Sequence, residues 1–180
     1  MEHRRLTVRE ALWLGLCLAV GVSPTARSGT DEAEIKAAFV YNFAKFVEWP
    51  AEAFSRPDAP LALCISGHDA VEAGLRHLEG REAQGRRLQV RQVDTPEEIA
   101  GCHVLFVAGP ETPQQGQLLQ SVREMPLLTV ADRRDFGRQG GVISLFVEAN
   151  RVQFSVNLNA AQSRGLKFSA RLLQLARVPR

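Results

Sequence analysis

Between residues 61 and 131, short strand-like segments alternate with helical patterns, and this alternation constrains the fold more than any other feature. The strand-like segments are residues 61–66, 88–93, 103–108 and 127–131. The helical patterns between them are residues 69–79, 96–100 and 113–123. Such a succession of strands and helices builds a mainly parallel sheet with helices on both faces. The sequence therefore predicts a three-layer α/β fold.

The C-terminal part of the chain departs from this rhythm. Residues 142–148 and 151–156 are strand-like, and the Ala149-Asn150 pair between them is typical of a tight turn. We expect these residues to add an antiparallel β-hairpin to the sheet. A short helix at 157–164 and a last helix capped by Ser169 would follow.

An N-terminal helix is expected over residues 31–49. Asp31 can cap it with Glu34 at the capping-box position, and Pro50 ends it. The expected inward stripe is Ile35, Ala38, Phe39, Asn42, Phe43, Phe46 and Val47.

The first 28 residues have the pattern of a cleaved signal peptide. Arg4, Arg5 and Arg9 precede twelve uncharged residues, 11–22, and small residues follow up to Ser28. Twelve apolar residues are too few to span a bilayer, which takes roughly 20. We expect residues 29–180 to form a single exported domain with no membrane span, located in the periplasm. An uncleaved anchor or a buried helix is the alternative.

The charge balance argues against nucleic-acid binding. The first 28 residues hold four of the 22 basic and two of the 20 acidic residues, which leaves 18 of each in residues 29–180. Nucleic-acid binding needs a basic footprint, and a neutral domain lacks one.

Two cysteines, Cys64 and Cys102, remain after removal of the signal peptide. An oxidising compartment and an even number of cysteines favour a disulfide between them. Two separate buried thiols are the alternative.

The sequence offers no strong catalytic or metal-binding pattern, so we expect no enzyme activity, cofactor or metal. The histidines share no ligand spacing, and no nucleophile-elbow motif is present. The Ser66–Asp69 segment is better explained as a strand-to-helix loop with Asp69 as the cap. Asp132 is better explained as a turn residue at a strand end, because the acidic pair and late lysine of a phospho-acceptor site are missing.

The N-terminal helix has a broad apolar arc, part of which could serve an interface. The chain's only tyrosine, Tyr41, lies near this helix together with Lys45 and Trp49. These three residues are the predicted partner surface.

Several motifs together resemble the YfiR family of small periplasmic proteins. The motifs are KAAFVYNFAKFVEWP at 36–50, GCHVLFV at 101–107, LTVAD at 128–132 with Phe136 and GGVI at 140–143, and FSVNL at 154–158 with GLK at 165–167 and LL at 172–173. They occur in order over nearly all of residues 29–180. The resemblance also places a disulfide at Cys64 and Cys102, and it implies no second one because the late hairpin has no cysteines.

The resemblance implies a function that the composition does not give. A YfiR-like protein would bind the periplasmic sensor region of a membrane-bound diguanylate cyclase and repress it, which would lower cyclic di-GMP and biofilm formation. An OmpA-like outer-membrane lipoprotein would sequester the repressor and relieve this repression. A homodimer is a further expected assembly. The alternative functions are a periplasmic adaptor or small-ligand sensor for a histidine kinase or transporter, and a hydrolase on an α/β scaffold.

Overall fold

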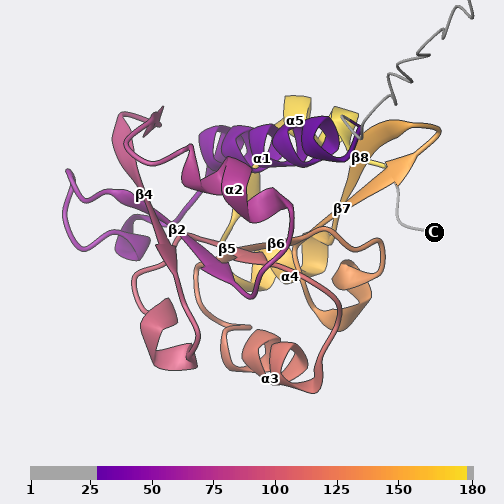
Figure 1. Cartoon of the computed structure of the whole chain (residues 1–180). Coiled ribbons are helices and arrows are strands. Elements are labelled where there is room, and N and C mark those ends of the chain that lie inside the picture. The colour runs from indigo at the N-terminus through magenta and orange to yellow at the C-terminus, as the bar shows by residue number, and fades with distance from the viewer. Residues whose placement is uncertain (1–27, 178–180) are drawn as a thin grey trace, which may run out of the picture.

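Seven strands form the central sheet in the order β3-β4-β2-β5-β6-β7-β8 (Figure 1). This computed structural model describes residues 28–177, so the predicted signal peptide lies outside the described residues except for Ser28. The strands are β2 (Leu61–Ser66), β3 (Glu82–Ala83), β4 (Arg86–Gln92), β5 (Val104–Val107), β6 (Leu128–Ala131), β7 (Ile143–Glu148) and β8 (Arg151–Val156). The pairs from β4 to β7 are parallel, whereas β3–β4 and β7–β8 are antiparallel. The predicted mainly parallel sheet with a C-terminal antiparallel hairpin is confirmed.

Helices cover both faces of the sheet. The α-helices are α1 (Ser28–Phe46), α2 (Val71–Arg76), α3 (Pro113–Ser121), α4 (Leu158–Ser163) and α5 (Ala170–Leu175). The 3-10 helices are η1 (Ala51–Ala53), η2 (Pro96–Ile99) and η3 (Phe136–Gln139). Figure 1 shows α1, α2 and α5 above the sheet and α3 below it. Among residues 28–177, no helix is both long and apolar enough to cross a membrane.

The central strands are buried on both faces, which explains why their sequences are apolar apart from Ser66 and Thr129. Leu63 and Phe106 belong to the core beneath α1, whereas Cys64 and Leu105 belong to the core above α3. Alternate residues of each strand therefore enter two different cores, one on each side of the sheet.

The structure corrects the predicted inward face of the N-terminal helix. Phe43 and Val47 are buried as expected, but Ile35 is 48% exposed and Phe46 is 43% exposed. The exposed side also includes Ala38 and Asn42, and Phe39 is half-buried. The buried side instead consists of Ala33, Lys36, Ala37, Val40, Phe43 and Ala44.

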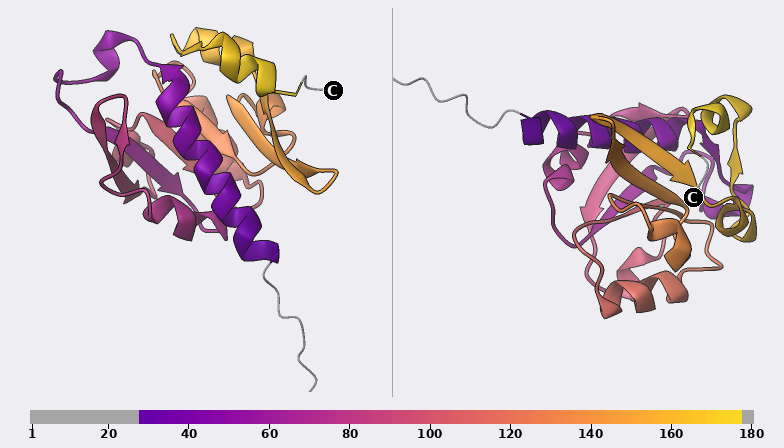
Figure 2. Two further views of the ribbon diagram at one scale, coloured as in Figure 1. Left: turned by 90° about the horizontal axis from the view of Figure 1, so that it is seen from above. Right: turned by 90° about the vertical axis from the view of Figure 1, so that its right-hand side faces the viewer.

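Close packing of α1 against α2 explains this rotation. A Cβ atom added to Gly74 of α2 would lie 2.8 Å from the Cβ of Ala37. The two helices therefore approach at small residues, which turns the side of α1 with the smaller side chains inward. The aromatic side of α1 turns toward α5 instead, which lies beside the C-terminal half of α1 (Figure 2).

The helix also begins and ends earlier than the sequence predicts. Asp31 lies in the first turn of α1 and is not its N-cap, because the helix begins at Ser28. At the other end, β1 (Val47–Glu48) pairs antiparallel with β9 (Lys167–Phe168). The Gln84 side chain donates hydrogen bonds to the carbonyls of Ala44 and Val47, at 2.8 and 2.7 Å. These long-range contacts provide hydrogen-bond partners for backbone carbonyls at the end of α1, so the helix ends before Pro50.

Candidate functional site

Tyr41, the first residue of the predicted partner surface, holds α1 against the β3–β4 hairpin. Its hydroxyl donates a hydrogen bond of 2.6 Å to the carbonyl of Glu82. The guanidinium of Arg81 lies 4.6 Å from the centre of its ring. The ring is half-buried between these contacts, so Tyr41 has a structural role whether or not a partner touches it.

Trp49 also makes contacts within the chain. Its indole nitrogen donates a hydrogen bond of 3.1 Å to the carbonyl of His103. Its ring meets Phe54 and the His103 imidazole edge-on, with both centroid distances 6.4 Å. Trp49 thus joins the segment after α1 to the start of β5.

Lys45 is exposed, and it connects the predicted surface to a neighbouring aromatic residue. Its ammonium lies 5.3 Å from the centre of the Tyr41 ring and 5.9 Å from that of Phe46. The structure therefore separates the three predicted residues: Lys45 faces solvent beside Phe46, whereas Tyr41 and Trp49 are tied to the fold.

An apolar groove lies between α1 and α5, and we call it the α1–α5 groove. It has a volume of about 250 Å³ and is lined by Phe39, Asn42, Phe43, Phe46, Phe154, Ser169, Arg171, Leu172 and Leu175. Leu175 is 64% exposed, the largest exposure among the bulky apolar residues of the described chain. Contiguous exposed apolar surface is common at interaction sites, so this groove is the candidate site.

Sequence reasoning missed this groove because it assigned Phe46 to the core. The periodicity of residues 31–49 fits a broad arc, and a broad arc does not show which part is buried. The available signal was that apolar residues of the N-terminal helix extend beyond one face. The other wall of the groove is formed by Leu172 and Leu175, which lie more than 120 residues later in the sequence.

A buried lysine fastens the N-terminal half of α1 to the sheet. The Lys36 ammonium donates to a carboxylate oxygen of Asp132 at 2.6 Å and to one of Glu32 at 2.5 Å. Burial acts to lower the pKa of Lys36, but its hydrogen bonds and ion pairs with the two carboxylates outweigh burial and raise it. Asp132, at the end of β6, is thus a partner for Lys36, and this explains its place without a catalytic role.

His103 is buried and held as a neutral ring. Its Nδ1 accepts a hydrogen bond from the amide of Ala62, and its Nε2 donates to the carbonyl of Ala53, both at 3.1 Å. Burial lowers the pKa of His103, and the positive charges of Arg86 and Arg91 lower it further, against the hydrogen bond to Ala53. The histidine therefore links the segment 49–60 to the sheet.

The two cysteines lie on neighbouring strands and are joined by a disulfide. Cys64 is in β2, Cys102 directly precedes β5, and their Cα atoms are 5.9 Å apart. The two cysteines are separated by 38 positions in the sequence, and the bond closes a loop that contains α2, β3, β4 and η2.

The remaining sequence candidates for chemistry have structural roles. Asp69 is not the N-cap of α2, which is Ala70, but it accepts hydrogen bonds from the amides of Val71, at 2.8 Å, and Gly109, at 3.1 Å, and so joins the start of α2 to the segment after β5. Among residues 28–177, no three His, Cys, Asp or Glu side chains gather closely enough to hold a metal ion.

The fold and these contacts define a small disulfide-bonded α/β protein whose clearest feature for function is an exposed apolar groove. A comparison with protein-family models matches residues 33–177 to the YfiR/HmsC-like family. The chain belongs to this family, as its motifs indicated. Membership indicates a periplasmic type of regulatory, non-catalytic protein linked to diguanylate cyclases. The disulfide fits an extracytoplasmic location.

Proposed function

We propose that this chain represses a membrane-bound diguanylate cyclase by binding the periplasmic sensor region of the cyclase. Family membership supports the regulatory role. The observation that carries the binding role is the α1–α5 groove, where Phe46 and Leu175 stay exposed on a folded domain. Burial of such apolar side chains by a partner is favourable, by roughly 1.5–3 kcal/mol for each fully buried one.

Repression follows if the chain binds the inactive state of the cyclase more tightly than the active state. A bound protein shifts an equilibrium only by the ratio of its affinities for the two states. An OmpA-like outer-membrane lipoprotein would relieve repression by competing for the same chain. A second copy of the chain would compete in the same way if it covered the groove.

The test measures cyclic di-GMP in a strain with an active partner cyclase. Deletion of the gene should raise cyclic di-GMP, and expression of the chain in the periplasm should lower it again. Expression of the Leu175→Glu variant should fail to lower it, because the added carboxylate would have to be buried in an apolar contact. The matched control is Gln174→Glu, which adds the same charge at an exposed neighbouring residue outside the groove lining.

The outcomes separate the proposed function from its alternative. Unchanged cyclic di-GMP after deletion contradicts repression and favours an adaptor or sensor for a histidine kinase or transporter. Full repression by the Leu175→Glu variant contradicts the assignment of the groove but leaves repression itself standing.

A further inference from the structure

The segment that joins β1 to β2 lies on the surface beside β4, and we call residues 50–59 the strap (Figure 1). Ala59 is the only buried residue of the strap, and its backbone hydrogen bonds join residues within the strap. Its hydrogen bonds to other segments among residues 28–177 are all made by two side chains, those of His103 and Arg86. The strap is therefore attached at few points, and one of them is a histidine that can titrate.

His103 holds the middle of the strap through both nitrogens of its ring. Its Nε2 donates to the carbonyl of Ala53 in the strap, and its Nδ1 accepts from the amide of Ala62 in β2, both at 3.1 Å. A backbone amide can only donate, so this Nδ1 carries no proton. Only the neutral imidazole makes both hydrogen bonds.

An aromatic ring of the strap lies against the same imidazole. The Phe54 ring is stacked on His103, with a centroid distance of 4.3 Å and an interplanar angle of 18°. The guanidinium of Arg86 lies 3.7 Å from the centre of the Phe54 ring. Trp49, directly before the strap, donates its indole N–H to the carbonyl of His103 at 3.1 Å. A charge gained by His103 would therefore lie close to an existing cation.

A second proton does not fit the attached imidazole. It would have to bind Nδ1 of His103, where it would face the amide hydrogen of Ala62. Two donors would then point at each other in a buried place, and the hydrogen bond would be lost. Protonation and attachment of the strap thus exclude one another.

The charges around His103 also oppose protonation. Arg86 and Arg91 of β4 act on the ring, and both are positive. The acids of the strap, Glu52 and Asp58, are exposed, and Asp58 pairs within the strap. Among residues 28–177, no carboxylate forms an ion pair with His103 that would compensate its charge.

We infer that the strap is released by acid: when His103 takes up a proton, the strap separates from the sheet while the rest of the fold stays intact. Release lets the charged imidazole reach water. The sheet does not need the strap, which contributes only Ala59 to the buried residues. The ratio of open to closed molecules should rise by up to about tenfold for each pH unit below about 6.5. This inference does not depend on repression of a cyclase.

Trp49 reports on the strap without a label, because the only other tryptophan of the chain, Trp13, lies in the predicted signal peptide. Acrylamide quenching of its fluorescence is measured on the purified chain without that peptide, from about pH 8 to about pH 5. Far-ultraviolet circular dichroism follows the fold. We expect quenching to increase below about pH 6.5 while the circular dichroism stays constant.

Nuclear magnetic resonance of the wild-type chain gives a second measurement that needs no variant. The indole N–H of Trp49 is bonded to the carbonyl of His103, so its signal should shift as the strap opens. We expect this shift to have the same midpoint as the titration of the His103 ring. Different midpoints would overturn the inference.

Two variants assign the transition to one histidine. His103→Gln does not take up the proton, so its quenching should not change over this pH range. The matched control replaces the exposed His68 and His77 together by Gln, and it should keep the wild-type transition. The inference is overturned if quenching of the wild type stays constant, or if its circular dichroism changes at the same pH. It is also overturned if His103→Gln keeps the transition or the control loses it.

Discussion

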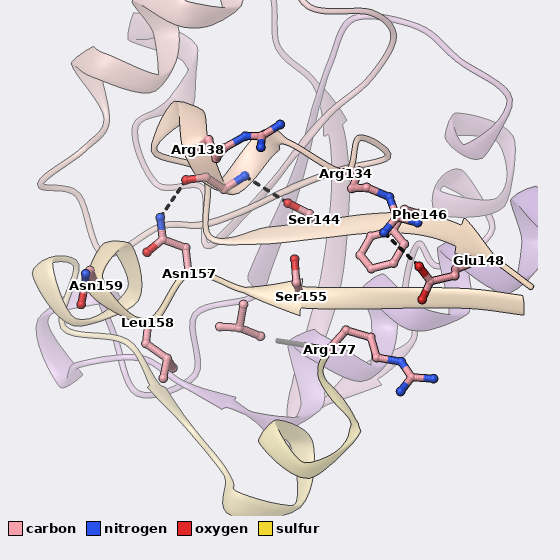
Figure 3. A pocket seen from close by; sticks show the side chains of 12 residues that line it. Arg134, Arg138, Ser144, Phe146, Glu148, Ser155, Asn157, Leu158, Asn159 and Arg177 are labelled. Atoms are coloured by element: carbon pink, nitrogen blue, oxygen red, sulfur yellow. Dashed lines mark hydrogen bonds and ion pairs between the residues drawn. The ribbon is translucent and has the colours of Figure 1, made fainter. Parts of the chain in front are cut away.

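Strands β2 and β8 have the same alternation of side chains but differ in what covers them. Both faces of β2 are sealed, since Leu63 packs beneath α1 and Cys64 is bonded to Cys102 in the opposite core. The two faces of β8 each reach an opening: Phe154 lines the α1–α5 groove, and Ser155 lines a second opening between η3, the β7–β8 hairpin and the start of α4 (Figure 3). The part of the sheet around β2 and β5, which we call the sealed end, therefore acts as scaffold. The β8 edge of the sheet offers surfaces for binding.

The largest expected effect on stability is loss of the disulfide at the sealed end. In the chain-entropy account, closing a loop of this length contributes about 4 kcal/mol, and we expect Cys64→Ser to cost about 2–5 kcal/mol of unfolding free energy. Urea unfolding with and without reductant measures it. Wild type in reductant should approach the variant, and the variant should not respond to reductant. Equal stability of the two proteins without reductant would show that the bond contributes nothing.

A pair of glycine substitutions tests the close approach of α1 and α2. Gly74→Ala should lower stability by about 1–2 kcal/mol, because the new Cβ would lie 2.8 Å from that of Ala37 in a packed core. Gly116→Ala, in the middle of α3, meets no atom within 4 Å and should raise stability by about 0.5–1 kcal/mol. Thermal unfolding should give opposite signs. A gain in both variants would contradict the tight contact.

Because His103 is buried as a neutral ring, we expect the unfolding free energy to depend on pH. Its pKa is lowered in the folded protein, so the unfolded chain takes up a proton more readily as the pH falls. Stability from the neutral ring is fully present above about pH 6.5, the ordinary histidine pKa. It is lost as the pH falls from there through the folded pKa. The difference in unfolding free energy between wild type and His103→Gln, measured from pH 8 to pH 5, should become smaller as the pH falls. A constant difference would contradict this role.

The smallest expected effect on stability belongs to the α1–α5 groove. Leu175 is mostly exposed, so Leu175→Glu should change the unfolding free energy by no more than about 0.5 kcal/mol. The same variant is expected to lose repression, which sets it apart from changes at the sealed end. A large drop in the melting temperature would show instead that Leu175 supports the fold.

The sequence predicts the sheet well because the burial of each central strand can be recognised from the apolar residues of that strand alone. The segments at 103–108 and 127–131 are apolar apart from His103 and Thr129, and both contain central strands. The Ala149-Asn150 turn is equally local: both residues have positive φ angles, 47° and 57°, as a tight hairpin turn needs.

The groove was harder to predict because it depends on contacts between distant segments. Which side of α1 is buried is decided by Gly74, and where α1 ends is decided by Gln84 and β9. None of these residues is adjacent to α1 in sequence. The exposed position of Phe46 follows from such contacts, so periodicity within α1 was unable to reveal it.

Site-specific photo-crosslinking in the periplasm tests the central claim most directly. A photoreactive residue at Leu175 places the probe on the α1–α5 groove. One at Arg123, an exposed residue two positions after the end of α3, places it next to the helix that covers the opposite side of the sheet. We predict that position 175, and not 123, is crosslinked to a membrane protein with a diguanylate cyclase domain. Crosslinking to that protein equally from both positions, or from 175 only to a histidine kinase or transporter, would contradict the account.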